Sequence, residues 1–289
     1  MLNPCSIVIL SHNGASFTEI CLRQLLQCEL PTELILCDNG STDSIPEVFA
    51  KFKLQFEEVG VVVKVISNGE NLGCSLARNI GWREATQPYI LFMDNDTAPK
   101  DYYYLSKLIQ CMEENPGLGV LGPKMIYPYE PHQIQCAGVD ITPQGRVIFR
   151  GRGEKISATE FNEFRKVPVL ISACWIMHRH YLETLNGLDE YFHPVQYEDF
   201  DFCMRVNQNG DYCAYTPTVE IYHFEGKTTG SWGKKEYSHN IAAQSLKFRK
   251  RWHQEFKKYP KLEGEFRWLA DEELGLNPSL VVNLDIVKR

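Results

Sequence analysis

The feature that most constrains this chain is the alternation of short apolar runs with amphipathic stretches over its first half. Apolar runs occupy residues 6–10, 33–37, 61–67 and 89–93, and stretches with helical spacing occupy 18–27, 45–56 and 74–85. Continuous apolar runs between helices are typical of parallel strands, because helices cover both faces of such a sheet. The pattern predicts an α/β fold with a doubly wound, mostly parallel sheet. Ligands of such sheets bind outside the carboxyl ends of the strands, so strand-ending residues are the candidates for function.

The pattern of the second half is less regular, and we expect this half to continue the same domain. We expect strands at 120–127 and 167–177, a hairpin over 138–150 turning at 143–145, helices near 180–185 and over 200–209, strands near 211–216 and 219–224, and a long basic helix over 239–258. There is no repeat, low-complexity tract or clear linker. The simplest division is one domain at 1–232 and a C-terminal helical extension at 233–289 packed on it.

Composition excludes several classes of protein. The net charge of −7 and the isoelectric point near 5.7 argue against general nucleic-acid binding, which leaves a basic footprint. The ten cysteines are scattered without a CxxC pair, which favours reduced thiols in a cytosolic protein. No basic region precedes the first apolar run, and no run approaches the ~18 residues that cross a bilayer. We expect a cytoplasmic protein without a signal peptide, in at most peripheral contact with the inner membrane face.

A first acidic cluster, DNGSTD at 38–43, follows the second predicted strand. Asn-Gly favours a turn, and Ser, Thr and Asp favour the start of a helix, so a capped turn accounts for these residues. A carboxylate at a strand end can also accept the imide N–H of uracil or thymine, a donor that cytosine lacks. Asp38 is therefore a candidate for binding a nucleotide base.

A second cluster, Asp94-Asn95-Asp96, comes directly after the fourth predicted strand. Two carboxylates spaced by one residue suit a hard divalent cation, which completes its shell with diphosphate oxygens and water. The alternative is a polar loop that helps to start the helix after Pro99. The position behind a parallel strand favours a metal site.

A third cluster, with Glu198, Asp199 and Asp201, opens a predicted helix. Acidic residues in a first turn are stabilised by the helix dipole, so capping alone can explain them. The functional interpretation makes one of them a general base that deprotonates an acceptor hydroxyl.

His223 closes a short predicted strand and precedes a Gly/Thr/Lys-containing loop. A single histidine is more often structural than a ligand. In this position, however, His223 could complete the metal site, with Lys227 close to a phosphate.

In chain order these segments resemble the large family-two class of inverting, metal-dependent glycosyltransferases with the GT-A fold, which includes bacterial rhamnosyltransferases and galactofuranosyltransferases. The resemblance runs over residues 6–230. It rests on SHNG at 11–14, DNGSTD at 38–43, ENLG at 70–73, ARNIG at 77–81, DND at 94–96, Glu198-Asp199 and the loop after His223.

The resemblance implies a site for a nucleotide-sugar donor. Asp38 would bind the base of a UDP- or dTDP-linked sugar, with Ser11 and Asn13 lining the same pocket. Arg78 and Asn79 would lie beside the nucleotide, and a contact on the helix surface is the alternative for Arg78.

The resemblance also implies a metal site and a catalytic base. Asp96 would ligate Mn²⁺ or Mg²⁺, Asp94 would ligate it as well or hold the ribose, and His223 would be the third protein ligand. Asp199 would deprotonate the acceptor, and a single displacement would invert the anomeric centre. The acceptor would be a saccharide, a lipid-linked molecule or a protein, in polysaccharide or glycoconjugate synthesis.

Two other classes compete with this assignment. A sugar nucleotidyltransferase opens with a Gly-rich basic loop after its first strand, whereas SHNGASF at 11–17 has one glycine and no lysine or arginine. A non-catalytic nucleotide-sugar-binding module would not need Asp96, Asp199 and His223 together.

The basic residues between 247 and 258 allow contact with an anionic membrane, and a solvated helix face is the simpler interpretation. A homodimer is compatible with the sequence, and we expect no nucleic-acid partner.

Overall fold

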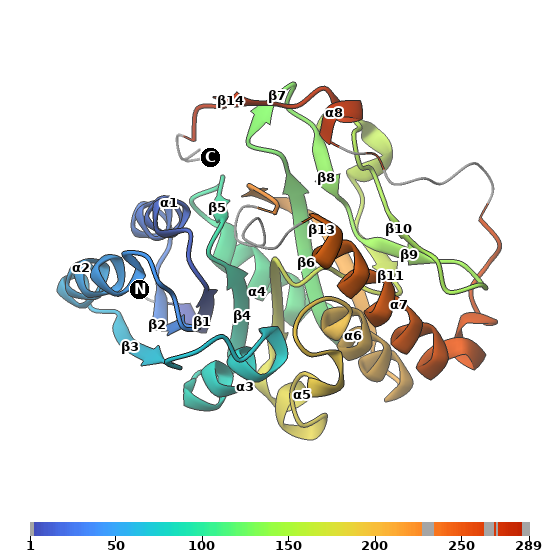
Figure 1. Cartoon of the computed structure of the whole chain (residues 1–289), viewed down its shortest axis with the longest axis horizontal. Coiled ribbons are helices and arrows are strands. Elements are labelled where there is room, and N and C mark those ends of the chain that lie inside the picture. Colours follow the sequence, from blue (N-terminus) through green and yellow to red (C-terminus); the bar gives the residue numbers. More distant parts are fainter. Residues whose placement is uncertain (1–2, 227–233, 263–268, 270, 285–289) are drawn as a thin grey trace.

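The computed structural model describes residues 3–226, 234–262, 269 and 271–284, and its centre is a twisted sheet between two helical layers (Figure 1). Helices α1, α2 and α4 cover one face of the sheet, and α3 and α6 cover the other (Figure 1). This arrangement confirms the α/β fold that the alternating pattern predicts.

The helices and strands have the following bounds. The strands that form the main sheet are β1 (Asn3–Ser11), β2 (Pro31–Asp38), β3 (Val62–Ser67), β4 (Tyr89–Asp94), β5 (Thr97–Pro99), β6 (Leu118–Ile126), β8 (Ile134–Cys136), β11 (Arg165–Val167), β12 (Cys174–His178) and β13 (Tyr212–His223). Two small ladders contain β7 (Tyr129–Glu130) with β14 (Asn277–Val281), and β9 (Val139–Ile141) with β10 (Val147–Phe149). The α-helices are α1 (Ala15–Leu26), α2 (Ile45–Glu58), α3 (Cys74–Glu84), α4 (Tyr104–Glu114), α5 (Arg179–Thr184), α6 (Glu198–Gln208), α7 (Lys234–Phe256) and α8 (Asp271–Leu274), and two 3-10 turns are η1 (Thr159–Phe161) and η2 (Glu190–Phe192).

The strand order in the main sheet is β11-β13-β6-β12-β4-β1-β2-β3, with β5 beside β13 and β8 beside β6. β1 is parallel to β2 and β4, β2 is parallel to β3, and β6 is parallel to β13. β12 is antiparallel to both of its neighbours, β4 and β6. The sheet is therefore mostly parallel, with a reversal in its middle.

Two predictions for the second half are wrong in detail. The apolar run at 167–177 is two strands, β11 and β12, which lie at different places in the sheet and are joined by residues 168–173. The segments at 211–216 and 219–224 form one strand, β13, whose register shifts between Thr216 and Glu220. Local apolarity cannot distinguish a continuous strand from a broken one, because both kinds of segment are buried.

The first-half helices follow from their apolar spacing. In α2, Ile45, Phe49, Phe52 and Phe56 are all buried on one side of the helix. In α3, Gly81 faces the sheet, and a Cβ atom there would lie 2.6 Å from Val8 Cγ1. Glycine at this position therefore allows α3 to lie close against β1.

The long helix α7 belongs to the main core. Phe248, Trp252 and Phe256 are buried in the same hydrophobic cluster as the sheet. Arg249, Lys250, Lys257 and Lys258 are exposed, which fits the solvated helix face, and membrane contact stays a prediction. No helix among the described residues is long and apolar enough to cross a membrane.

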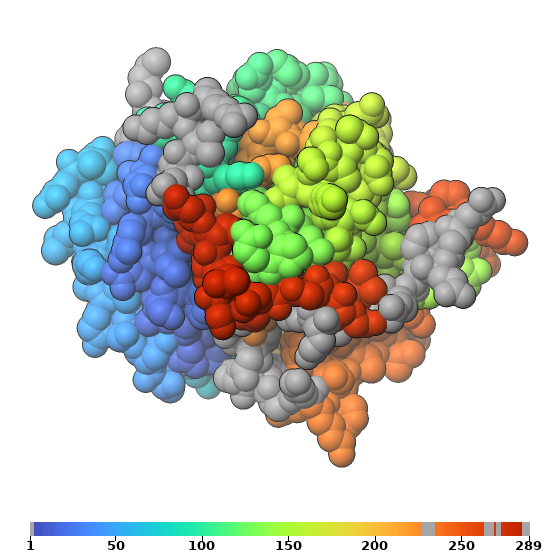
Figure 2. Space-filling model, turned by 90° about the horizontal axis from the view of Figure 1, so that it is seen from above, coloured from blue at the N-terminus to red at the C-terminus, as the bar shows by residue number. Residues whose placement is uncertain are grey.

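The last described segment crosses back over the molecule. Figure 2 shows residues 271–284 between the N-terminal region and the segment around β7. β14 pairs with β7, and Gln24 of α1 donates a hydrogen bond to the Leu284 carbonyl. The extension therefore contains a strand as well as helices, which the sequence pattern did not predict. All ten cysteines are free thiols, as expected.

Candidate active site

Asp94, Asp96 and His223 lie together at the carboxyl end of the sheet, and we call them the strand-end cluster. Asp94 ends β4, and Asp96 lies in the turn between β4 and β5. β5 pairs with the end of β13, with Thr97 opposite His223, which brings the DND turn beside the histidine. One ligand atom from each of the three side chains lies within 4.8 Å of the other two. Strand pairing thus brings together the three side chains that the sequence predicts as metal ligands.

The strand-end cluster has more hydrogen-bond acceptors than donors. His223 Nδ1 lies 2.7 Å from Gln135 Oε1, and because an amide oxygen only accepts, this contact is a hydrogen bond when Nδ1 carries the proton. His223 Nε2 faces Asp96 Oδ1 at 3.4 Å, and this oxygen has no hydrogen-bond partner among the described residues. A cation placed between these atoms would satisfy both of them. The residues present therefore fit a divalent metal ion.

The electrostatics of His223 support this conclusion. Burial lowers the pKa of His223 and the adjacent Asp96 carboxylate raises it, and the net shift is upward. A proton on Nε2 balances part of the negative charge of the neighbouring carboxylates, and a metal ion at this place would balance the same charge.

Arg78 connects the strand-end cluster to helix α6. Its guanidinium is 3% exposed and lies 2.5 Å from Asp94 Oδ1, 2.7 Å from Ser172 Oγ and 3.5 Å from Glu198 Oε1. A contact on the helix surface, the alternative for this residue, is wrong because the side chain is buried. Burial raises the pKa of Asp94 and Glu198, and the Arg78 charge opposes that shift in both carboxyls.

The first turn of α6 separates two neighbouring carboxylates. Glu198 is buried and points to Arg78, whereas Asp199 is partly exposed. Asp199 accepts hydrogen bonds from the backbone N–H groups of Ser172 (3.0 Å, to Oδ2) and Phe200 (2.8 Å, to Oδ1). Burial and the nearby Glu198 raise the pKa of Asp199 to about 7. A carboxyl group with such a pKa can exchange a proton near neutral pH.

The three residues predicted to line the base pocket lie together at the ends of β1 and β2. Ser11 and Asp38 are register partners on the two strands. Asp38 Oδ1 accepts from the Ser41 N–H at 2.8 Å, and Asn13 Oδ1 accepts from the Thr42 N–H at 2.8 Å. Ser11 Oγ is buried without a hydrogen-bond partner among the described residues. The capped turn therefore exists, and a role of these residues in base binding stays a prediction.

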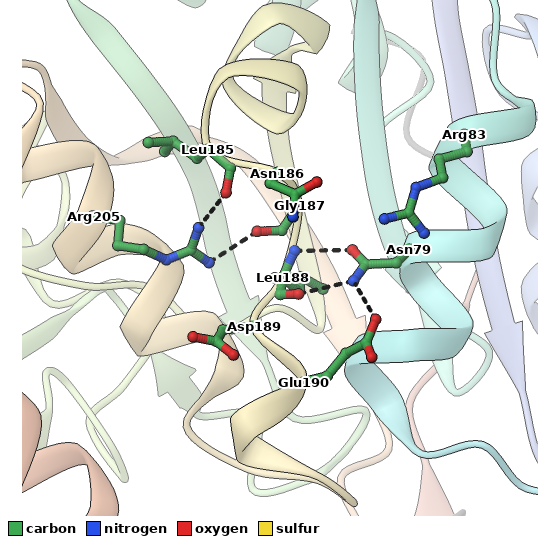
Figure 3. Close-up of a pocket in the computed structure, with 9 residues that line it drawn as sticks. All are labelled: Asn79, Arg83, Leu185, Asn186, Gly187, Leu188, Asp189, Glu190 and Arg205. Carbon is green, nitrogen blue, oxygen red and sulfur yellow. Dashed lines mark hydrogen bonds between the residues drawn. The ribbon is translucent and has the colours of Figure 1, made fainter.

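Asn79 lies away from this group. The side-chain oxygen of Asn79 accepts a hydrogen bond from the Leu188 N–H, and its Nδ2 donates one to the Leu188 carbonyl (Figure 3). Asn79 also lines a pocket of 440 Å³ with Arg83 and Glu190. No member of the strand-end cluster lines that pocket. Adjacent helix residues point about 100° apart, so Arg78 and Asn79 face different neighbours. The predicted phosphate contact, Lys227, lies outside the described residues.

Sequence reasoning missed two residues of the site, Gln135 and Ser172. Gln135 lies in a short strand and Ser172 in the loop before β12, and neither belongs to a recognisable motif. Only the folded chain reveals them, because their partners, His223, Arg78 and Asp199, are distant in sequence.

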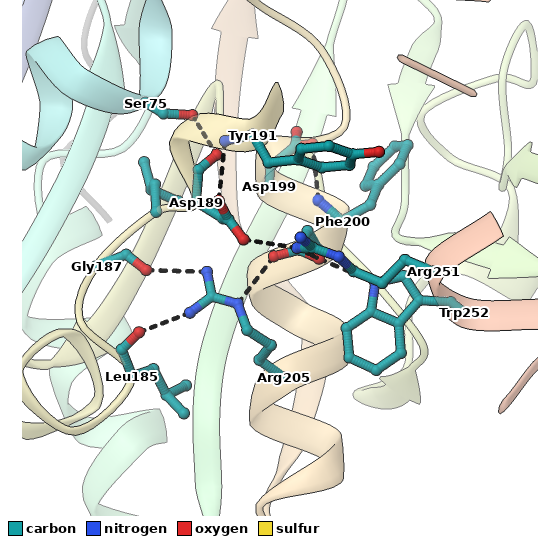
Figure 4. A network of polar contacts seen from close by, with 12 residues as sticks. Ser75, Leu185, Gly187, Asp189, Tyr191, Asp199, Phe200, Arg205, Arg251 and Trp252 are labelled. Atoms are coloured by element: carbon teal, nitrogen blue, oxygen red, sulfur yellow. Dashed lines mark hydrogen bonds and ion pairs between the residues drawn. The ribbon is translucent and has the colours of Figure 1, made fainter. Parts of the chain in front are cut away.

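Asp201, the third acidic residue of α6, serves a different network. It is fully buried and accepts from Arg205 at 2.8 Å and from Arg251 and Trp252 at 2.9 Å. Figure 4 shows Arg205, Arg251 and Trp252 converging from α6 and α7. Asp189 also belongs to this group, because it forms an ion pair with Arg251 at 2.7 Å. We call the five residues Asp189, Asp201, Arg205, Arg251 and Trp252 the α6–α7 network. The network fixes the extension to the helix that carries Asp199.

A comparison with protein families decides the assignment. The profile described as "Glycosyl transferase family 2" matches residues 6–185, more than half of the chain. The chain belongs to this family. The matched region includes the β1 and β2 ends, Arg78 and the DND motif, and it stops before Asp199 and His223.

Family relatives include proteins of very different length. An N-acetylglucosaminyl-diphospho-decaprenol L-rhamnosyltransferase of Mycobacterium tuberculosis is 24% identical over 255 residues, covering 80% of this chain and 79% of the relative. The uncharacterized protein y4gI of Sinorhizobium fredii is 26% identical over 205 residues, covering 68% of this chain. The chain spans 22% of the length of y4gI and 24% of a Pasteurella multocida chondroitin synthase.

Solved structures share the GT-A fold of this family-2 glycosyltransferase. GalNAc-T7 with UDP, GalNAc and Mn²⁺ matches with a TM-score of 0.69 at 17% identity, covering 88% of this chain and 49% of that one. The mannosyltransferase PcManGT of Pyrobaculum calidifontis, with GDP-Man and Mn²⁺, matches with a TM-score of 0.60 at 14% identity, covering 92% of this chain and 66% of that one. Both similarities concern the fold.

Proposed function

We propose that this glycosyltransferase transfers a sugar from a UDP- or dTDP-sugar to an acceptor hydroxyl, with inversion and with a divalent cation, Mn²⁺ or Mg²⁺. The observation that carries the proposal is the strand-end cluster, where a buried Asp96 oxygen without a hydrogen-bond partner among the described residues faces His223. The bound Mn²⁺ in the structures of GalNAc-T7 and PcManGT supports the metal part of the proposal.

The cluster would hold the cation through Asp96 and His223, with Asp94 as a third ligand. When bound there, the cation would supply Lewis-acid stabilisation of the charge that develops on the leaving diphosphate. The guanidinium of Arg78 lies 2.5 Å from Asp94 Oδ1, and this ion pair limits the rotation of the Asp94 carboxylate. The predicted neighbours of the nucleotide base lie at the same edge of the sheet: Ser11 and Asp38 end the adjacent strands β1 and β2, and Asn13 follows β1.

Asp199 would act as the general base. Its two backbone hydrogen bonds fix the orientation of the carboxylate, and its pKa of about 7 suits proton abstraction near neutral pH. Attack by the deprotonated acceptor on the face opposite the leaving group forms the new glycosidic bond and breaks the bond to the diphosphate. One such displacement inverts the anomeric centre.

The name of one relative suggests which class of acceptor to test first. The rhamnosyltransferase relative, aligned over most of its length, carries a diphospho-decaprenol substrate in its name. A lipid-linked saccharide is therefore the first acceptor to test, before free saccharides and proteins. The exposed cations of α7 would favour an anionic membrane surface around such an acceptor.

The test is release of nucleoside diphosphate from a panel of nucleotide sugars in the presence of Mn²⁺, with and without candidate acceptors. We expect acceptor-stimulated release from at least one UDP- or dTDP-sugar. Nucleotide binding without release from any donor would favour a non-catalytic binding module and contradict the proposal.

A further inference from the structure

We propose that Gln135 is a positioning residue that fixes the tautomer of His223 and thereby sets the affinity of the strand-end cluster for a divalent cation. The inference rests on the metal dependence proposed above. Gln135 belongs to none of the motifs in the sequence, and it does not belong to the cluster itself.

The geometry isolates one contact. Gln135 lies in β8, which pairs with β6 beside β13, and its side chain is 1% exposed. Its Oε1 lies 2.7 Å from His223 Nδ1. Its Nε2 is buried and has no hydrogen-bond partner among the described residues. Among the described residues, the side chain of Gln135 therefore makes its one hydrogen bond through the amide oxygen, to the ring of His223.

The chemistry of imidazole turns this contact into a choice between tautomers. Neutral histidine has one N–H donor and one nitrogen lone pair, and only the lone pair can bind a metal ion. Because Gln135 Oε1 can only accept, it stabilises the tautomer with the proton on Nδ1. The lone pair then lies on Nε2, the nitrogen that faces Asp96 Oδ1 at 3.4 Å. Hydrogen bonds of this kind, from a ligand histidine to an outer group, raise metal affinity and orient the ring.

Gln135 also limits rotation of the ring. His223 is the last residue of β13, so the strand ladder fixes its backbone and leaves the ring orientation to side-chain contacts. A hydrogen bond from the other side of the ring holds the imidazole plane toward the DND turn. Without that bond, both tautomers and other ring orientations would compete with the metal-binding form.

The experiment measures Mn²⁺ affinity directly, by calorimetry or by electron paramagnetic resonance, with no donor or acceptor present. Gln135→Met keeps the length of the side chain but removes the acceptor, and we expect the Kd for Mn²⁺ to rise by about 10- to 100-fold. Gln135→Glu keeps an acceptor facing Nδ1–H, and we expect an affinity at or above that of wild type. Ring ¹⁵N shifts of the metal-free protein, recorded at a pH at which the ring is neutral, should report the Nδ1–H tautomer in wild type and Gln135→Glu, and a mixture in Gln135→Met.

Three controls separate this role from plain structural damage. Gln244 is a similarly buried glutamine whose Nε2 donates to the His193 carbonyl at 2.7 Å and to Asn240 Oδ1 at 3.3 Å, and Gln244→Met should leave Mn²⁺ affinity unchanged. In a His223→Ala background, Gln135→Met should cause no further loss. Gln135→Glu in that background should give no gain, because its effect acts through the ring and not through its charge.

The outcomes distinguish the inference from the proposed function. Unchanged Mn²⁺ affinity in a folded Gln135→Met protein, with affinity reduced in His223→Ala, overturns the role of Gln135 and leaves the metal site intact. Absence of Mn²⁺ binding in wild type, with or without UDP, overturns the proposed metal dependence itself.

Discussion

Two acidic regions of this molecule differ in how their oxygen atoms are used. In the α6–α7 network, both oxygens of Asp201 are occupied, by two arginines and an indole N–H. In the strand-end cluster, a buried oxygen of Asp96 lacks a hydrogen-bond partner among the described residues and faces His223. The first region has all of its charge balanced by protein, and the second has an excess of negative charge at the sheet edge. The difference separates a structural network from a candidate site, although each contains one buried and one partly buried aspartate.

The two regions meet on one helix. Asp199 and Asp201 lie in the first turn of α6, only two residues apart. Asp199 accepts hydrogen bonds from the backbone N–H groups of two residues. Asp201 accepts hydrogen bonds from charged side chains instead. The experiments below test whether this contrast in partners corresponds to a contrast in function.

Removal of the metal should have the largest effect. We expect chelation with EDTA to reduce sugar transfer below detection and added Mn²⁺ or Mg²⁺ to restore it, because the charge of the leaving diphosphate would otherwise be unbalanced. Asp96→Ala should lose both transfer and metal-dependent nucleotide binding while remaining folded. Full activity in EDTA would reduce the strand-end cluster to a polar turn.

Loss of the proposed base should come next. Asp199→Asn keeps the shape of the side chain and one acceptor oxygen but removes the base, so turnover should fall by roughly 10²–10⁴. Donor affinity should change little, and the melting temperature should fall modestly because one of the two backbone N–H groups loses its acceptor. Near-wild-type turnover in a folded Asp199→Asn protein would exclude Asp199 as the base.

The pH dependence should follow the same residue. Because Asp199 must be deprotonated to act, turnover should fall about tenfold per pH unit below its pKa of about 7. A pH–rate profile of saturated enzyme checks this, and a flat profile between pH 5.5 and 8 would contradict it.

The stability of the protein should change in the opposite direction. The folded-state pKa of Asp199 is raised above the unfolded value of ~3.9, so folding favours the protonated carboxyl. That contribution to the free energy of unfolding is present below about pH 4 and is lost as the pH rises through about 7. Asp199→Asn should therefore weaken the fall in stability between these limits, which denaturant titrations at several pH values can measure.

The matched change in the α6–α7 network should affect stability more than turnover. Asp201→Asn leaves Arg205 and Arg251 without their shared carboxylate, and we expect a loss of ~3 kcal/mol in the free energy of unfolding. Turnover of the folded fraction should stay within about tenfold of wild type. A folded, stable Asp201→Asn protein with turnover as low as that of Asp199→Asn would remove the contrast between the two residues.

The preference for the nucleotide base should be the smallest effect. Asp38 has one oxygen already occupied by the Ser41 N–H, so it is intermediate between the two regions. An imide contact to Asp38 should make UDP or dTDP bind about tenfold more tightly than GDP, and Asp38→Ala should reduce that ratio toward one. Calorimetry with the free diphosphates measures it. Equal or tighter binding of GDP, the nucleotide of the donor in the PcManGT structure, would contradict the assignment.

Much of the fold could be predicted because its signals are local. The apolar runs that became β1, β2, β3 and β4 lie next to one another in both the sequence and the sheet. Their parallel arrangement then placed Asp38 and Asp94 at the same edge without further information. The second half was harder, because β12 runs against its neighbours and β13 pairs with β6, a strand that is distant in the sequence.

The sequence by itself therefore determined the α/β architecture, the family and the list of candidate ligands, because periodicity and motif spacing are properties of neighbouring residues. The tertiary structure decided which candidates meet. The pairing of β5 with β13 brings His223 to Asp96, and the buried Arg78 links Asp94 to Glu198. Gln135 and Asp201 acquire their partners only in the folded chain, because hydrogen bonds between distant strands and helices depend on packing and leave no pattern along the sequence.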